Sequence, residues 1–207
     1  QEAYQFLKDS GLIFDDFSDF NKNYSEQRHH IYVDESGNWL RKATKFTNGK
    51  WAQYRWENEQ WRPKVSGARN VPYGLNRLLS NNEVEFCFVY EGEKDVERAW
   101  QHGLSATCNV GGAGKWTDEL NQFLIGRTVC IVPDNDVAGT NHARKVEASL
   151  RFSGIDCFIL WDILDGLAEK EDFSDWMDFN DNDLEKFVCL VRNAAKAPRK
   201  TETYYDG

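Results

Sequence analysis

The sequence predicts an α/β fold, in which a parallel sheet flanked by helices is preceded by a small antiparallel β-rich subdomain. Two observations lead to this fold class. Residues 31–65 consist of β-prone segments separated by turn residues, which is typical of antiparallel hairpins. From residue 84 onward, short continuous apolar runs alternate with helical stretches, which is typical of strands buried on both faces of a parallel sheet.

The first 30 residues are polar and acidic. Phe14, Phe17 and Phe20 recur there at three-residue spacing, which is compatible with a short docking helix. His29 and His30 stand side by side without a further ligand residue nearby, and we interpret them as surface or packing histidines. Because Met177 is the only methionine, we expect the chain to be a fragment or a processed product of a longer protein.

The antiparallel region is predicted from four segments, IYVD, WLRKATKF, WAQYRW and WRPKV. Turn residues separate them at 36–38, 48–49 and 57–60. The Asn-Gly pair at 48–49, placed between alternating segments, is a strong hairpin signal. We therefore expect a small sheet of sequential hairpins.

This β-rich region is basic, although the chain as a whole carries a formal net charge of −9. Residues 31–80 hold nine Lys and Arg against four Asp and Glu. Cations follow a phosphate backbone and aromatic faces stack on bases, so this composition suits a single strand of nucleic acid. The candidate strand-binding residues are Arg41, Lys45, Arg55, Trp51 and Trp56. The alternative is an ordinary sheet whose aromatics form a packed face and whose cations form the solvated face.

The α/β region is predicted from four apolar runs, at 84–90, 106–110, 128–133 and 156–161. Helical stretches are expected at about 94–102, 115–124, 137–153 and 185–196, and the tail after Pro198 is expected to be loose. We predict three parts: a β-rich subdomain over 1–80, an α/β catalytic domain over 81–180, and a C-terminal helix and tail over 181–207.

Composition narrows the class of protein. The apolar and aromatic content is that of a globular protein, and no stretch reaches the roughly 20 apolar residues that span a bilayer. Three of the five cysteines lie inside apolar runs, and no CxxC or Cys/His cluster is present. We therefore expect no zinc site, no disulfide framework, no membrane partner, and a reducing, cytoplasmic location.

Carboxylates follow two of the predicted strands at the point where each strand ends. Glu91 comes directly after the run 84–90, and Asp134 and Asp136 come directly after the run 128–133. Parallel strands bring their carboxyl ends to one edge of a sheet, so these acids are expected to converge there. Asp134 and Asp136 lie two residues apart on a segment that we expect to be extended, so both are expected to point to the same side. Converging carboxylates are stabilised by a hard divalent cation, which predicts a Mg²⁺ or Mn²⁺ site.

The two acidic motifs, EGEKD and DNDVAG, in this order on strand ends, resemble the TOPRIM domain of bacterial, phage and mobile-element DNA primases and primase-helicases. The stretches GLSATCNVGGAGKW, EDFSDWMD and RNVPYGLNRLL resemble the same subgroup, and the likeness covers roughly residues 30–180. The resemblance implies that Glu91 acts as a general acid/base or metal ligand and that Asp134 and Asp136 hold the metal. It also aligns Asp95 and Asp175 with acidic family positions, although either could instead cap a helix.

A glycine-rich loop lies between the two acidic motifs. Residues 111–114 read GGAG and precede Lys115, but the loop is not a Walker A motif, because Asn109 and Trp116 stand where a glycine and a hydroxyl residue are required. Its backbone N–H groups could receive a phosphate, which makes Gly111, Gly112 and Lys115 candidate substrate-binding residues. Lys94 is a further candidate. A tight strand-to-helix turn explains the loop equally well.

The resemblance implies a metal-dependent nucleotidyltransferase that makes RNA primers on single-stranded DNA during replication of a phage, plasmid or mobile element. The implied partners are a single-stranded template, nucleoside triphosphates, and a replicative helicase domain in the same or another chain. Two alternatives stay open. A TOPRIM nuclease would use the same metal site, and a non-catalytic DNA-binding domain of a replication protein would keep the acids for the fold.

Overall fold

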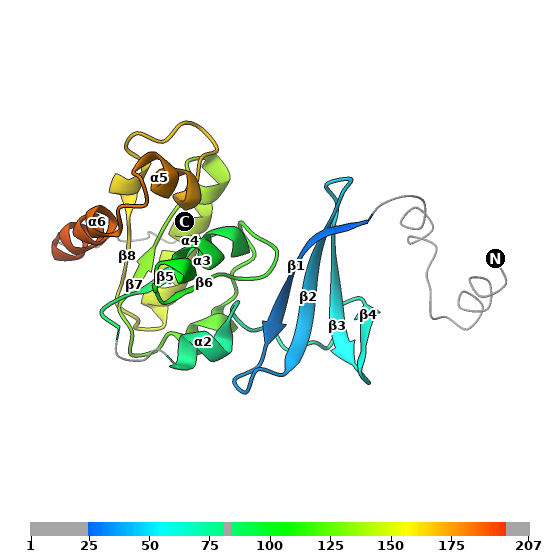
Figure 1. Ribbon diagram of the computed structural model, residues 1–207. Helices are drawn as coiled ribbons and strands as arrows, with labels where there is room; N and C mark the ends of the chain where they lie inside the picture. The colour runs from blue at the N-terminus through cyan, green and yellow to red at the C-terminus, as the bar shows by residue number, and fades with distance from the viewer. Residues whose placement is uncertain (1–24, 81–83, 198–207) are drawn as a thin grey trace, which may run out of the picture.

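The computed structural model describes residues 25–80 and 84–197. Two four-stranded sheets organise the chain, one antiparallel in the order β1-β2-β3-β4 and one parallel in the order β6-β5-β7-β8. Figure 1 shows the antiparallel sheet to one side of the helix-flanked parallel sheet. The predicted fold class is therefore confirmed. The expected docking helix around Phe14 and the tail after Pro198 lie outside the described residues.

The antiparallel sheet consists of the strands β1 (Glu26–Val33), β2 (Trp39–Phe46), β3 (Trp51–Glu57) and β4 (Gln60–Pro63). All three predicted turns are confirmed. Gly49 has a φ of 79°, and the β3–β4 turn places Asn58 and Glu59 at φ values of 51° and 59°. Two successive left-handed residues are the geometry of a type I′ hairpin turn, whose twist matches that of the flanking strands.

One face of this sheet packs against the helix that begins within the first acidic motif, α3 (Glu93–Gln101). Tyr32 Oη donates a hydrogen bond of 2.7 Å to Glu93, and His30 Nδ1 lies 2.9 Å from the Glu97 carboxylate. His30 is 1% exposed, whereas His29 is exposed and paired with Glu26. The interpretation of these histidines as packing and surface residues is confirmed.

The parallel sheet consists of the short strands β5 (Cys87–Val89), β6 (Ala106–Thr107), β7 (Val129–Ile131) and β8 (Cys157–Ile159). Each lies inside one of the four predicted runs, and every strand residue is buried. β5 and β7 are neighbours, with Val89 paired to Ile131. This pairing places the segments that follow β5 and β7 next to each other.

Helices pack around this sheet. α3, α4 (Val137–Phe152) and α6 (Leu184–Lys196) agree with the prediction, but the predicted helix 115–124 is a 3₁₀ helix, η2 (Asp118–Phe123). Three short elements were not predicted: α2 (Leu75–Ser80), η3 (Trp161–Leu164) and α5 (Phe173–Phe179). They span two turns or fewer, so periodicity gives them no clear signal.

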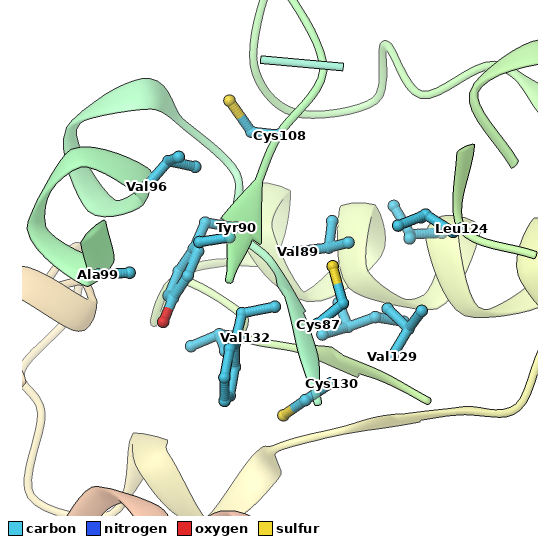
Figure 2. Close-up of a cluster of buried hydrophobic side chains, with 14 of the residues drawn as sticks. Cys87, Val89, Tyr90, Val96, Ala99, Cys108, Leu124, Val129, Cys130 and Val132 are labelled. Atoms are coloured by element: carbon cyan, nitrogen blue, oxygen red, sulfur yellow. The ribbon is translucent and has the colours of Figure 1, made fainter. Parts of the chain in front are cut away.

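One hydrophobic core joins the two sheets and the helices. Figure 2 shows Cys87 near Val129 and Tyr90 near Val132, with Val96 and Ala99 of α3 alongside. The core extends across both predicted boundaries, since it includes Tyr32 and Ala43 on one side and Phe187 and Val191 of α6 on the other. The predicted three-part division stays a prediction. No helix within the described residues is long and apolar enough to cross a bilayer.

Candidate active site

The acids of both motifs lie beyond the carboxyl ends of the paired strands β5 and β7. Glu91 follows β5 by two residues, and Asp134 follows β7 by three. The carboxylates of Glu91, Asp134 and Asp136 influence one another electrostatically. The expected convergence on one sheet edge therefore occurs, because neighbouring parallel strands end at the same edge.

Glu91 is half-buried and is held by the glycine-rich loop. The backbone N–H of Ala113 donates to its carboxylate, and a Cβ added to Gly112 would lie 3.9 Å from Glu91 Oε1. The other oxygen, Oε2, is buried and has no hydrogen-bond partner within the described part of the chain. Burial, followed by the charge of Asp136, raises the pKa of Glu91. A carboxylate in this position is poised to bind a cation or to hold a proton.

Asp134 sits where the first turn of α4 closes over it. A Cβ on Gly139 would lie 2.7 Å from the Asp134 backbone oxygen and 2.9 Å from its Cβ, so only glycine allows this approach. Burial raises the pKa of Asp134 to about 8, and the carboxylates of Asp95, Glu91, Asp172 and Asp136 add to the effect. A cation bound here would offset this repulsion.

Asp136 caps the helix that follows. Its Oδ1 accepts a hydrogen bond of 2.7 Å from the Gly139 N–H, and its own N–H donates to the Asp134 carbonyl at 2.9 Å. The backbone of Asp136 is extended, with φ of −147° and ψ of 176°, and its N–H contact to Asp134 tightens the segment at Asn135. The expectation that both aspartates point to the same side stays a prediction.

A third segment completes the acidic cluster. Asp172 is the N-cap of α5, forms a capping box with Asp175, and pairs with Lys94. The two residues of the box bind each other's backbone N–H groups, which confirms the capping interpretation of Asp175. Sequence reasoning did not select Asp172. Its signal was the sequence D-x-x-D before Trp176, which also marks a helix start.

Asp95 ties the first motif to this third segment. It is 3% exposed and accepts hydrogen bonds from the Ser174 N–H at 3.0 Å and from the Ser174 hydroxyl at 2.6 Å. Burial and the nearby Asp172 carboxylate raise its pKa. Asp95 thus caps a helix, as the alternative interpretation held, but the helix is α5 and not its own α3.

The acidic cluster offers oxygen ligands of the kind that a divalent cation prefers. Over residues 25–80 and 84–197, no three His, Cys, Asp or Glu side chains lie close enough together to ligate one ion. The chemistry of the site nevertheless suits a cation, because Glu91 Oε2 is buried without a partner among the described residues and the charges of four other carboxylates act on Asp134. One or two of the carboxylates of Glu91, Asp134 and Asp136 would hold it, with water and substrate phosphates as the remaining ligands.

The glycine-rich loop lies between the acids and the antiparallel sheet. Gly111, Gly112 and Gly114 have φ values of 86°, 71° and 73°, a left-handed run that only glycine adopts without strain. A Cβ on Gly111 would lie 3.7 Å from Gln53 Nε2 of β3. Lys115 is exposed beside this loop. The loop therefore connects the face of β3 that carries Gln53 with the carboxylate of Glu91.

The predicted strand-binding residues fall on both faces of the antiparallel sheet. Trp51 and Arg55 share a face with Gln53, since side chains alternate along a strand, whereas Trp56 points to the other face. Trp51 is 46% exposed and stacks on His30, and Lys45 is its direct partner on β2.

The remaining members of this predicted set are already engaged in the fold. Arg41 is 8% exposed and donates to the Ala68 carbonyl, so its guanidinium is not available to a bound strand. Arg55 pairs with Glu57 and donates to Ser66. Trp56 packs among the aromatic rings of Trp39 and Trp61. On the face of the sheet that carries Trp56, the aromatic side chains therefore pack against one another, as in the alternative of an ordinary sheet with a packed aromatic face.

Several solved structures are similar to this chain in fold. The chain is similar to the DnaG primase catalytic domain bound to ssDNA, at 21% identity over 92% of this chain with a TM-score of 0.60. It is also similar to the Aquifex aeolicus primase, at 17% identity over 79% of this chain with a TM-score of 0.62. A third similar structure is the primase fragment of the bacteriophage T7 primase-helicase, at 15% identity over 81% of this chain with a TM-score of 0.55.

This chain has the fold of a DNA primase catalytic core. It spans 60% of that DnaG chain, 39% of the Aquifex chain and 62% of the T7 fragment. No family model and no curated protein sequence matches it. The predicted primase-type TOPRIM fold is thereby confirmed at the level of structure, and the acidic cluster lies in this primase fold at the ends of β5 and β7.

Proposed function

We propose that this chain is a primase-type TOPRIM domain that transfers nucleotides in a metal-dependent reaction and makes RNA primers on single-stranded DNA. The observation that carries the proposal is the meeting of Glu91, Asp134 and Asp136 beyond two paired parallel strands, in a fold similar to primase catalytic cores. We assign the activity to replication of a phage, plasmid or mobile element, on the sequence resemblance described above.

The residues of the cluster have distinct roles in this proposal. Glu91, Asp134 and Asp136 would hold one or two Mg²⁺ or Mn²⁺ ions, which would supply positive charge to offset that of the nucleotide triphosphate and the transferring phosphoryl group. Glu91 is held by the Ala113 N–H, and its Oε2, which has no partner among the described residues, would be available to ligate a cation or accept a proton. Lys94 is kept beside the cluster by Asp172, where its charge is available to a phosphate.

The face of the antiparallel sheet that carries Trp51 and Lys45 is the proposed path of the template. It leads through Gln53 to the glycine-rich loop and so to Glu91. One similar DnaG structure is bound to ssDNA. The proposed partners are therefore a single-stranded template and nucleoside triphosphates, with a replicative helicase domain in the same or another chain, as in the T7 primase-helicase.

Primer synthesis on a single-stranded template tests the proposal. We expect labelled nucleotides to be incorporated with Mg²⁺ or Mn²⁺ and not with a chelator. Glu91→Gln should leave template binding unchanged and reduce incorporation by roughly 10²–10⁴-fold, as expected for loss of a general acid/base or its metal ligand. Glu185→Gln, an exposed carboxylate in the first turn of α6, is the matched control and should not change the rate.

The same assay separates the two alternatives. Labelled single strand incubated with metal and without nucleotides would be cut by a TOPRIM nuclease, and this result would replace the primase assignment. Template binding without incorporation or cleavage, in wild type as in Glu91→Gln, would identify a non-catalytic binding domain. Equal incorporation rates in Glu91→Gln and wild type would remove Glu91 from the reaction.

A further inference from the structure

The glycine-rich loop that holds Glu91 is itself held from the opposite side by helix α4. His142 Nδ1 accepts a hydrogen bond of 3.1 Å from the Gly114 N–H, and Lys145 Nζ donates one of 2.8 Å to the Gly114 carbonyl. His142 and Lys145 are three residues apart on the helix and therefore share a face. Both polar backbone groups of Gly114 are thus bound by side chains of α4.

The hydrogen bond fixes the chemical state of His142. A backbone N–H can donate only to an imidazole nitrogen that carries no proton, so the ring is neutral with its proton on Nε2. Burial, together with Lys145, lowers the pKa of His142 to about 4, which keeps the ring neutral at physiological pH. Its acceptor at Nδ1 is therefore permanently available to the loop.

His142 is a poor choice for packing alone. It is 4% exposed, and its Nε2 is buried without a hydrogen-bond partner among the described residues. A leucine would fill the same space without an unpaired buried donor. The feature that a leucine lacks is the Nδ1 acceptor that binds Gly114, so the loop contact explains why a histidine stands here.

The loop needs such an anchor because its backbone is intrinsically permissive. Three of its four residues are glycines with positive φ, and glycine loses more conformational freedom on ordering than any other residue. Just before the loop, Asn109 Nδ2 donates a hydrogen bond of 2.9 Å to the carbonyl of Gly112, which fixes the end of the loop that is near β6. The bonds from α4 to Gly114 fix the other side, next to the Ala113 N–H that reaches Glu91.

We propose that His142 is a positioning residue, which acts through Gly114 and Ala113 to set Glu91 relative to Asp136 at the start of the same helix. The expected effect of His142 on catalysis rests on the proposed function, whereas its effect on the position of the glycine-rich loop does not. Helix α4 thus carries Asp136 of the second motif at its N-cap and, about 1.7 turns further on, His142, which holds the loop next to Glu91.

Three variants of the whole chain test the proposal. His142→Leu keeps the volume and removes the acceptor, whereas His142→Asn restores an acceptor, because its Oδ1 is bonded to Cγ as Nδ1 is. Val146→Ala is the matched control, since it weakens the same buried face of α4 without touching the loop. Thermal denaturation of each variant measures the fraction that is folded.

The first readout is independent of activity. In ¹⁵N-labelled wild type we expect a scalar coupling between the nitrogens of Gly114 and His142, together with slow exchange of the Ala113 and Gly114 amide protons. His142→Leu should accelerate both exchanges, His142→Asn should slow them again, and Val146→Ala should leave the coupling in place. Absence of the coupling in wild type, or unchanged exchange in His142→Leu, would overturn the proposal.

The second readout is chemistry. We expect Mg²⁺ affinity and kcat for primer synthesis to fall about 10- to 100-fold in folded His142→Leu, the range seen when a group that orients a metal ligand is removed. The KM for template should not change, and His142→Asn should recover most of the loss. A variant His142→Asn as impaired as His142→Leu would overturn the proposal. If wild type makes no primer, the proposed function fails, and amide exchange and Mg²⁺ affinity decide the positioning role.

Discussion

Substitution of Asp134 by asparagine should stabilise the metal-free protein, and increasingly so as the pH rises. Burial of the carboxylate, followed by the charges of four other carboxylates, raises its pKa from 3.8 to about 8. Between these two pH values the native state binds a proton that the unfolded state has released, so the stability of wild type falls as the pH rises from about 4 to about 8. The asparagine side chain of the variant does not titrate, so its contribution is constant.

The magnitude follows from the pKa. A rise from 3.8 to about 8 corresponds to at most about 5–6 kcal/mol at about 1.4 kcal/mol per pKa unit. Water reaches part of this carboxylate and screens its neighbours, so we expect the variant to gain about 2–3 kcal/mol at pH 8.5 relative to pH 4. Asp165→Asn, which replaces an exposed carboxylate after η3, is the matched control for the loss of one negative charge.

Urea denaturation in the presence of a chelator, at several pH values between 4 and 8.5, measures this difference. Addition of Mg²⁺ should then reverse it, because wild type gains about 2.7 kcal/mol when the ion is present at 100 times its Kd and the variant does not. A stability difference that is independent of pH would show that Asp134 is not subject to carboxylate repulsion. A variant that is less stable than wild type at pH 8.5 would make Asp134 a structural residue.

Two further predictions follow from the close packing of the site and from the two faces of the antiparallel sheet. Gly139→Ala should destabilise the fold by about 1–3 kcal/mol, because its Cβ would overlap backbone atoms of Asp134 that cannot move independently, and denaturation of the variant measures the loss. Trp51→Ala should weaken single-strand binding by about 1–3 kcal/mol in a fluorescence titration and leave the stability unchanged in urea, whereas Trp56→Ala should lower the stability and leave the binding affinity unchanged. The reverse pattern would place the template on the face that carries Trp56.

The elements found from sequence are those whose signal is local. The four buried strands are short apolar runs, and the hairpins are marked by turn residues such as Asn48–Gly49. The short helices α2 and α5 were missed because six or seven residues do not complete two periods of an amphipathic pattern. Helix α5 is specified instead by its capping box, which stabilises its first turn.

The sequence by itself determined where the first two acidic motifs lie. Glu91 and Asp134 follow two buried strands within three residues, and parallel strands end at one sheet edge, so their convergence follows from their position in the chain. Only the tertiary structure decided which groups surround them. Asp172 meets Lys94 across 78 residues, and His142 reaches Gly114 across 28. Contacts of this kind depend on how helices pack on the sheet, and no local pattern of residues encodes that geometry.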